Sequence, residues 1–283
     1  MGILHLAAPC RLVPVTFTLY GRGDRVSAWH EFLSQIQSHL SELEDDGCDC
    51  PFFRGHVDSR WKLLCGLGRR DPGDFKKKNI ESILYYDFLS QAGPLLQRPD
   101  SSWDVLFSMQ HHGLPTRLLD WSATFAVGLY FALKPYVSLA SSAPEVFNAL
   151  DKLPCVWVLN PFELNQAMGS EAVVLNPEID LLDSYREIFI EESKTLASKV
   201  TAVNPTQAGK RLAAQRGCFT LHADLFSPLE GGNPSYLKQF VLPKEAVVDG
   251  VGFLKLAGMN EYSLFPDLDG LSRHLKSIHV DWI

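Results

Sequence analysis

The sequence predicts an α+β fold, in which a small mixed sheet is packed against helices. Two kinds of segment alternate irregularly along the 283 residues: apolar stretches with helical spacing, and short stretches of β-branched and aromatic residues. The strands are too few and too unevenly spaced for a doubly wound parallel sheet. Because one α/β unit can reach about 250 residues, the length fits one large domain with a short extension.

The composition excludes several classes of protein. Apolar residues make up 46% and charged residues 21% of the chain, which excludes a largely disordered chain and a fibre. The apolar runs are shorter than the ~18–20 residues that cross a bilayer, so we expect no membrane partner. The formal net charge of −7 argues against a general DNA-coating protein but is compatible with a local basic groove.

The N-terminus and the cysteines predict a cytoplasmic protein. The first 20 residues lack a basic region followed by an apolar one, so we expect no signal peptide. The six cysteines form no CxxC pair, which favours free thiols in a reducing compartment.

The first half of the chain is predicted to be mainly helical. Apolar residues at steps of three and four predict a helix over 26–43, and the acidic residues 42–46 predict a solvated loop that ends at Gly47. Residues 51–56 then predict a short strand. The later helices predicted in this half cover residues 80–88, 103–110 and 126–133.

The second half combines strands and helices. Residues 138–154 are rich in Ser, Ala and Pro and predict a flexible connection. Segments rich in β-branched and aromatic residues predict strands over 155–159, 218–222 and 240–242. The helices predicted here cover residues 182–198, 243–258 and 271–278.

The first polar cluster, Arg54-Gly55-His56, lies at the end of the strand predicted over 51–56. An arginine followed by glycine suits a clamp for phosphate or carboxylate, because the guanidinium donates two hydrogen bonds and glycine lets a ligand approach the backbone. An arginine paired with a structural carboxylate is an equally good interpretation.

The second cluster covers residues 110–122 and is the densest polar stretch in the chain. Adjacent histidines such as His111 and His112 point in different directions, so a metal site that uses both is disfavoured. Asp120 is able to orient Arg117 or His112, or to cap the next helix, a role that Ser122 can also fill. Burying so many polar groups is costly, which favours a functional site.

The third cluster covers residues 211–219. Gln215 and Gly217 precede a predicted strand, and Arg211 and Arg216 supply positive charge. Alternatively, these arginines complement the dipole at the end of a helix.

Together, these clusters resemble the FRG domain family, named for its Phe-Arg-Gly motif. The resemblance lies in Arg54-Gly55 after an aromatic pair, in the run from Gln110 to Trp121, and in Arg211, Gln215, Gly217 and Phe219; it continues in 264–271. It implies an N-terminal extension of strand and helix over 1–48 and an FRG domain over 49–283.

The layout of this family is similar to that of ADP-ribosyltransferases of the arginine–serine–glutamate type, which consume NAD. The similarity implies an ADP-ribosyltransferase-like fold and NAD as a substrate. The residues implied to bind NAD are Arg54, Gly55, Gln110, His111, Thr116, Arg117, Trp121, Ser122 and Phe219. The residues implied to be catalytic are Asp120, His112 and Gln215.

The sequence departs from these transferases at the late strand. Their glutamate stabilises the oxocarbenium-like ribose, whereas Gln215 and Gly217 stand at the matching positions here and carry no negative charge. Removing such electrostatic stabilisation costs ~10²–10³ in rate. Three interpretations follow: Asp120 replaces the glutamate, His111 or His112 supplies the chemistry, or the domain binds its ligand without turnover.

The expected function is therefore that of an NAD-binding effector, for example a bacterial toxin or phage-defence protein. It would transfer ADP-ribose to an unknown protein or nucleic-acid acceptor, with an antitoxin or another defence protein as a partner. One alternative is a non-catalytic module that binds a nucleotide or nucleic acid. Another is a metal-dependent phosphodiesterase or nuclease that uses His111, His112, Asp120, Asp267 and Asp269.

Overall fold

The structure is a computed structural model that describes residues 27–73, 75, 79–92, 95, 101–139, 151–205 and 209–279. Most of the predicted connection over 138–154, and the first 26 residues of the predicted extension, lie outside the described residues. None of the helices in the described ranges is both long enough and apolar enough to span a membrane.

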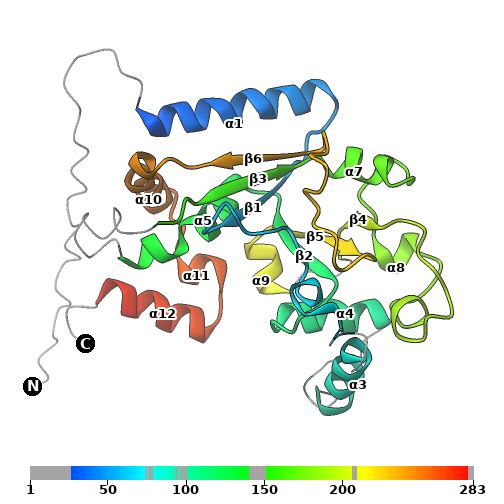
Figure 1. The fold of residues 1–283 in the computed structure, drawn as a ribbon. Helices are drawn as coiled ribbons and strands as arrows, with labels where there is room; N and C mark the ends of the chain where they lie inside the picture. Colours follow the sequence, from blue (N-terminus) through cyan, green and yellow to red (C-terminus); the bar gives the residue numbers. More distant parts are fainter. Residues whose placement is uncertain are drawn as a thin grey trace, which may run out of the picture.

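A six-stranded antiparallel sheet forms the centre of the molecule (Figure 1). The strands are β1 (Phe52–His56), β2 (Leu118–Ser122), β3 (Cys155–Leu159), β4 (Val200–Val203), β5 (Gly217–His222) and β6 (Leu237–Val241). Their order is β4-β5-β2-β1-β3-β6, so the two strands that come first in the chain lie in the middle. The mixed α+β class predicted from the sequence is thus confirmed.

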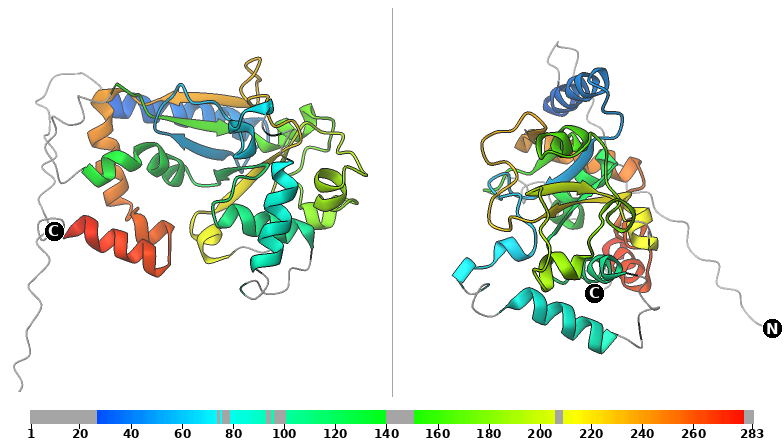
Figure 2. Two further views of the ribbon diagram at one scale, coloured as in Figure 1. Left: turned by 60° about the horizontal axis from the view of Figure 1, so that its bottom comes forward. Right: turned by 90° about the vertical axis from the view of Figure 1, so that its right-hand side faces the viewer.

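The helices are distributed over both ends of the chain and both faces of the sheet. Their bounds are α1 (Ala28–Asp45), α3 (Ile80–Ala92), α4 (Ser102–His111), α5 (Phe125–Leu139), α7 (Pro161–Ala167), α8 (Pro177–Asp180), α9 (Lys210–Ala214), α10 (Val247–Leu256), α11 (Glu261–Leu264) and α12 (Leu268–Ile278). Short 3-10 turns cover Leu67–Arg69 and Lys244–Ala246. Helix α3 lies on the side of the molecule opposite to α1 (Figures 1 and 2).

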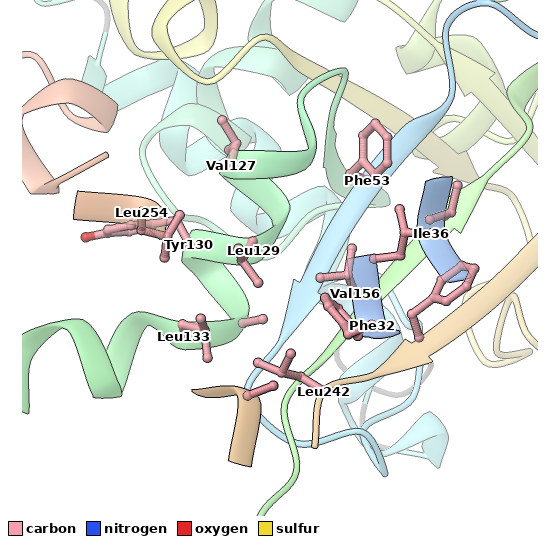
Figure 3. Close-up of a cluster of buried hydrophobic side chains, with 14 of the residues drawn as sticks. Phe32, Ile36, Phe53, Val127, Leu129, Tyr130, Leu133, Val156, Leu242 and Leu254 are labelled. Carbon is pink, nitrogen blue, oxygen red and sulfur yellow. The ribbon is translucent and has the colours of Figure 1, made fainter. Parts of the chain in front are cut away.

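One face of β1, β3 and β6 is covered by α5, α1 and α10. Figure 3 shows this cluster, in which Phe32 of α1 and Leu129 of α5 pack with Phe53 and Val156 of the sheet. Helix α5 crosses β1 closely at Gly55, where an added Cβ would lie 1.9 Å from the carbonyl oxygen of Gly128. Gly55 is therefore required for packing, whereas the sequence suggested that it leaves room for a ligand.

The other face of the sheet is covered largely by loops. Leu63, Cys65 and Leu67, from the segment after β1, pack on Trp121 and Trp157. Because this segment also carries polar residues, its packing places them beside the sheet.

A third cluster lies where α4 and the segment around Tyr185 cover β2 and β5. It includes Trp103, Tyr185 and Phe219.

Several sequence predictions need correction. Residues 182–198 do not form one amphipathic helix: Leu182 is fully exposed, and only Arg186–Ile190 coil, as a single π-helical turn. The turn ends because Glu192 has φ +52°, in the left-handed region. Helix α1 continues to Asp45, so most of the acidic segment predicted as loop is helical.

Candidate functional site

A cleft of about 1040 Å³ opens between the two central strands. β1 and β2 share a single register pair, Phe53 with Ser122, so the strands separate toward His56 and Leu118. The walls come from these strands, from the segment 57–70, from the ends of α4 and α9, and from the start of α5. The volume is at the upper end of the range of small-molecule sites.

Arg54 bridges the two separated strands. Its Nη1 donates a hydrogen bond to the backbone carbonyl of Asp120, and its Nε donates to Nε2 of His56 at 3.2 Å. Burial lowers the pKa of Arg54 to about 10, so the guanidinium remains charged at neutral pH. No carboxylate in the described part of the chain lies within ion-pair distance of it. The guanidinium charge is therefore left to act on the cleft.

Asp120 is an exposed carboxylate with a fixed orientation. Nε2 of Gln110 donates to its Oδ2 at 2.8 Å. The hydroxyl of Thr116 in turn donates to Oε1 of Gln110 at 2.6 Å and accepts from the N–H of Leu118 at 3.0 Å. Asp120 and Gln110 line the cleft, and the buried Thr116 supports them from behind. Asp120 orients neither Arg117 nor His112.

His56 lies beside Arg54 and is neutral. Burial lowers the pKa of His56 to about 3, and the neighbouring charges of Arg54 and Arg69 act in the same direction. A neutral imidazole accepts the hydrogen bond from Arg54 without adding charge to the cleft.

The late-strand residues form part of the cleft wall. Gln215 precedes β5, as predicted, and it is also the C-cap residue of α9; its Nε2 donates to the carbonyl of Leu264 at 3.1 Å. The hydroxyl of Ser122 donates to the carbonyl of Gln215 at 2.7 Å and accepts from the N–H of Thr124 at 3.0 Å. Ser122 and Gln215 therefore stabilise the cleft wall through hydrogen bonds to backbone groups.

The cleft is strongly basic. Five cationic side chains line it, whereas Asp120 is the only carboxylate among the lining residues that the structure describes. The cations are Arg54, Lys62, Arg69, Arg70 and Arg211. Lys62 lies 3.5 Å from Glu230, and Arg211 packs over the ring of Phe265, with 4.7 Å between its Cζ and the ring centroid. A chain with a net charge of −7 thus concentrates positive charge at one cleft.

Arg117, expected to bind NAD, lies outside the cleft. Its Nε and Nη2 donate to the two carboxylate oxygens of Glu81, and its Nη1 donates to the carbonyl of Ala223 at 2.9 Å. Tyr185 donates to the same Glu81 at 2.7 Å. Since both members of the ion pair are buried, Arg117 is a structural residue and the expectation is corrected.

Four other predicted residues are also absent from the cleft lining: Phe219, His111, His112 and Thr116, which supports Gln110 from behind. The ring of Phe219 is 4% exposed and packs against Phe107. His111 and His112 end α4 and contact each other, with ring centroids 5.0 Å apart. The pKa of His111 is lowered by burial and by its neighbour His112.

Trp121 lines the cleft but offers little surface to a ligand. The side chain is 4% exposed, and its Nε1 donates to the hydroxyl of Thr220 at 3.1 Å. Neither Trp121 nor Phe219, both implied by the resemblance to bind NAD, thus offers an exposed ring face to the cleft.

Sequence reasoning missed the contribution of the segment after β1. Trp61, Lys62, Arg69 and Arg70 all line the cleft. The adjacent arginines after Gly68 were a visible signal of positive charge, but nothing in the spacing placed them beside Arg54. The long-range hydrogen bond from the N–H of Leu67 to the carbonyl of Thr116, 3.1 Å, brings this segment to β2.

A metal centre is not assembled from the described residues. Across the described ranges, no three His, Cys, Asp or Glu side chains are grouped in a way that could hold a metal ion. Asp267 instead caps α12 by accepting the N–H of Gly270 at 2.6 Å. The ligand set proposed for a metal-dependent nuclease is therefore not brought together.

The fold and the site define the protein as an α+β protein with a basic cleft between its central strands. The family model of the FRG domain matches residues 51–138. The match covers β1, β2 and most of α5, and thus Arg54 and Asp120, but not Gln215. No curated protein and no solved structure matches the chain.

Proposed function

We propose that the cleft binds NAD and that the protein is an ADP-ribosyltransferase-like enzyme. One observation carries this proposal: five cationic side chains surround a single oriented carboxylate in a cleft large enough for a dinucleotide. Guanidinium groups are well suited to the two phosphates of NAD. The acceptor of the ADP-ribose group would be a protein or a nucleic acid.

The proposed reaction breaks the bond between the ribose C1′ atom and the nicotinamide ring nitrogen. Nicotinamide leaves as a neutral molecule with the bonding electron pair, and positive charge develops on the ribose. The carboxylate of Asp120, oriented by Gln110, stabilises this charge. The acceptor nucleophile then forms the new bond to C1′ and loses its proton to solvent.

Titration with NAD, followed by assay of released nicotinamide, tests the proposal. The Arg54→Gln variant should lose NAD binding, because the buried cation disappears from the cleft. Asp120→Asn should still bind NAD but release nicotinamide ~10²–10³-fold more slowly. Arg186→Gln is the matched control, since Arg186 pairs with Glu191 away from the cleft.

Two results would contradict the enzyme assignment. One is wild-type protein that fails to bind NAD; the other is an Asp120→Asn variant that releases nicotinamide at the wild-type rate. Thermal unfolding of each variant checks that the fold is retained.

A binding module without turnover is the second candidate. It is favoured by the absence of an acidic residue at the start of β5, where Gln215 donates its amide to Leu264 and Gly217 has no side chain. NAD binding by the wild type without nicotinamide release, with cell extract supplied as the source of acceptors, would favour this function.

A further inference from the structure

Trp61 is the large aromatic side chain that the cleft exposes. It lines the cleft and is 50% exposed, whereas the other tryptophan in the lining, Trp121, is 4% exposed. An indole ring exposed to this degree offers a flat apolar face on which a planar ligand can stack.

The turn that carries Trp61 is rigid. Asp58 accepts hydrogen bonds from the backbone N–H of Arg60 at 3.0 Å and from its guanidinium at 2.8 and 2.9 Å. The N–H of Trp61 donates to the carbonyl of Asp58 at 3.0 Å, and Nε2 of Gln239 donates to the carbonyl of Ser59 at 2.7 Å. The backbone that carries the ring is therefore held by hydrogen bonds, which reduces the entropy lost when a planar ligand stacks on the ring.

A line of contacts joins Trp61 to the charged end of the cleft. The ring centroid of Trp61 lies 6.0 Å from that of His56. His56 accepts a hydrogen bond from Arg54, and Arg54 also donates to the backbone carbonyl of Asp120. Arg54 and His56 are two residues apart on one strand, a separation of about 7 Å. Along this line of contacts, His56 and Arg54 come between Trp61 and Asp120.

Further cations line the same cleft, and in addition to burial the charge of Arg69 is close enough to lower the pKa of both Arg54 and His56. Lys62 follows Trp61 directly, and Arg69 and Arg70 lie on the same segment and also line the cleft. One side of the Trp61 ring carries the ammonium of Lys152, 5.9 Å from the centroid, so a ligand has the remaining surface. The line of contacts thus runs from an aromatic platform at Trp61 through the cation of Arg54 to Asp120.

We propose that Trp61 is the platform on which the adenine ring of the ligand stacks, which fixes the direction of the dinucleotide in the cleft. Adenine lies at Trp61, the two phosphates lie among Arg54, Arg69 and Arg70, and the nicotinamide ribose lies at Asp120. This inference rests on the proposed function, and it adds a specificity-determining residue that the sequence did not single out.

Titration calorimetry with NAD, AMP and ribose 5-phosphate tests the assignment on wild type, Trp61→Ala and Trp61→Phe. Because stacking of a base on an aromatic ring contributes ~1–3 kcal/mol, Trp61→Ala should weaken AMP and NAD binding roughly tenfold or more. Ribose 5-phosphate has no base, so its affinity should stay the same. Trp61→Phe should retain most of the affinity for AMP.

Tyr86→Ala is the matched control, because Tyr86 is 48% exposed and lies on α3 outside the cleft lining. It should leave all three affinities unchanged. A loss in Trp61→Ala that is equal for AMP and ribose 5-phosphate would overturn the stacking assignment, as would unchanged AMP binding or an equal loss in Trp61→Phe.

The outcomes separate this inference from the proposed activity. Trp61-dependent AMP binding without nicotinamide release from NAD would leave the adenine subsite in place and refute the transferase. Nicotinamide release that Trp61→Ala leaves unaltered, in rate and in KM, would support the transferase and refute the subsite. Failure of the wild type to bind AMP and NAD would refute both.

Discussion

At the scale of single residues, Arg54 and Arg117 have different roles, although the resemblance implied that both bind NAD. Arg54 faces the cleft without a carboxylate in ion-pair distance among the described residues, whereas Arg117 is buried against Glu81 and stacks over Phe189, 4.3 Å from its centroid. Each arginine is adjacent to an apolar residue, Phe53 before Arg54 and Leu118 after Arg117, so the local sequence does not predict their different roles. What distinguishes them is the carboxylate of Glu81, which α3 places against Arg117.

The buried pair predicts a large stability loss in Arg117→Ala. Removing one member leaves the carboxylate of Glu81 buried without its partner, which costs about 3–5 kcal/mol in the free energy of unfolding. Urea denaturation measures this loss. In contrast, Arg186→Ala breaks an exposed pair and should cost about 1 kcal/mol or less. Equal losses in the two variants would contradict the assignment of Arg117 as structural.

The two buried histidines predict a pH dependence of stability. Burial lowers the pKa of both His56 and His222 to about 3, below the usual value of 6.5. The unfolded chain therefore binds more protons than the native one between pH 6.5 and 3, and stability falls as the pH falls through this window. Each histidine contributes ~1.4 kcal/mol per pH unit.

A variant of His222 isolates this contribution. Nε2 of His222 lies 2.9 Å from the hydroxyl of Thr220, and a glutamine amide can replace that contact. Urea unfolding at pH 7, 6 and 5 should show a shallower pH slope in His222→Gln than in the wild type. An unchanged slope would mean that His222 binds protons equally in the native and unfolded states, and would contradict its lowered pKa.

At the scale of elements, the contact between β1 and α5 depends on glycine. A Cβ on Gly55 would lie 1.9 Å from the carbonyl of Gly128 and 2.4 Å from the N–H nitrogen of Ala132, both of them backbone atoms that cannot move alone. Gly55→Ala should therefore destabilise the protein by about 1–3 kcal/mol or more. The melting temperature and urea unfolding both report this loss.

Gly252 provides the opposite case within a helix. It lies in α10, and a Cβ there would meet no atom within 4 Å. Gly252→Ala should raise the free energy of unfolding by about 0.5–1 kcal/mol, because alanine restricts the unfolded chain and favours the helix. If both glycine variants shifted stability in the same direction, the close-approach argument would fail.

The elements show what the sequence was able to predict. Helix α1 and strands β1, β3 and β5 carry strong periodic or β-branched signals, and the structure confirms all four. β4, Val200–Val203, is buried along its whole length but is only four residues long, too short for a periodicity to show. The prediction of a helix over 182–198 was wrong because the apolar residues of this segment pack on α4 through a single turn and do not form one helical face.

The candidate site was predicted in part. Its charged centre could be read from the sequence, since Arg54, Gln110, Asp120 and Gln215 all line the cleft. Its aromatic side could not, because Trp61 reaches the cleft only through the turn fixed by Asp58 and the packing of 63–67. Contacts of this kind depend on the tertiary fold and produce no recognisable residue pattern in the sequence.

At the scale of the whole molecule, the basic cleft predicts salt-dependent binding. The Debye length falls from ~10 Å at 0.1 M salt to ~3 Å at 1 M, so the attraction between the cleft and an anion weakens with salt. The affinity for NAD should fall roughly severalfold over this range, whereas that for neutral adenosine should stay nearly constant. Titrations at increasing sodium chloride measure both.

A pair of double variants identifies the charges responsible. Arg69→Gln with Arg70→Gln should reduce the salt dependence of NAD binding, because both side chains line the cleft. Lys194→Gln with Lys199→Gln removes the same charge outside the lining and should leave the dependence intact. The cleft assignment is wrong if the two double variants behave alike.

The arrangement of the strands has a consequence for how the chain is made. The segment that matches the FRG domain contains β1 and β2, which share one register pair with each other and form their longer ladders with β3 and β5. Ribosomes release the central strands first and their neighbours later, so both strands emerge with open edges. A fragment that stops after α5 should therefore aggregate, and the nascent chain must stay protected from self-association until β5 has left the ribosome.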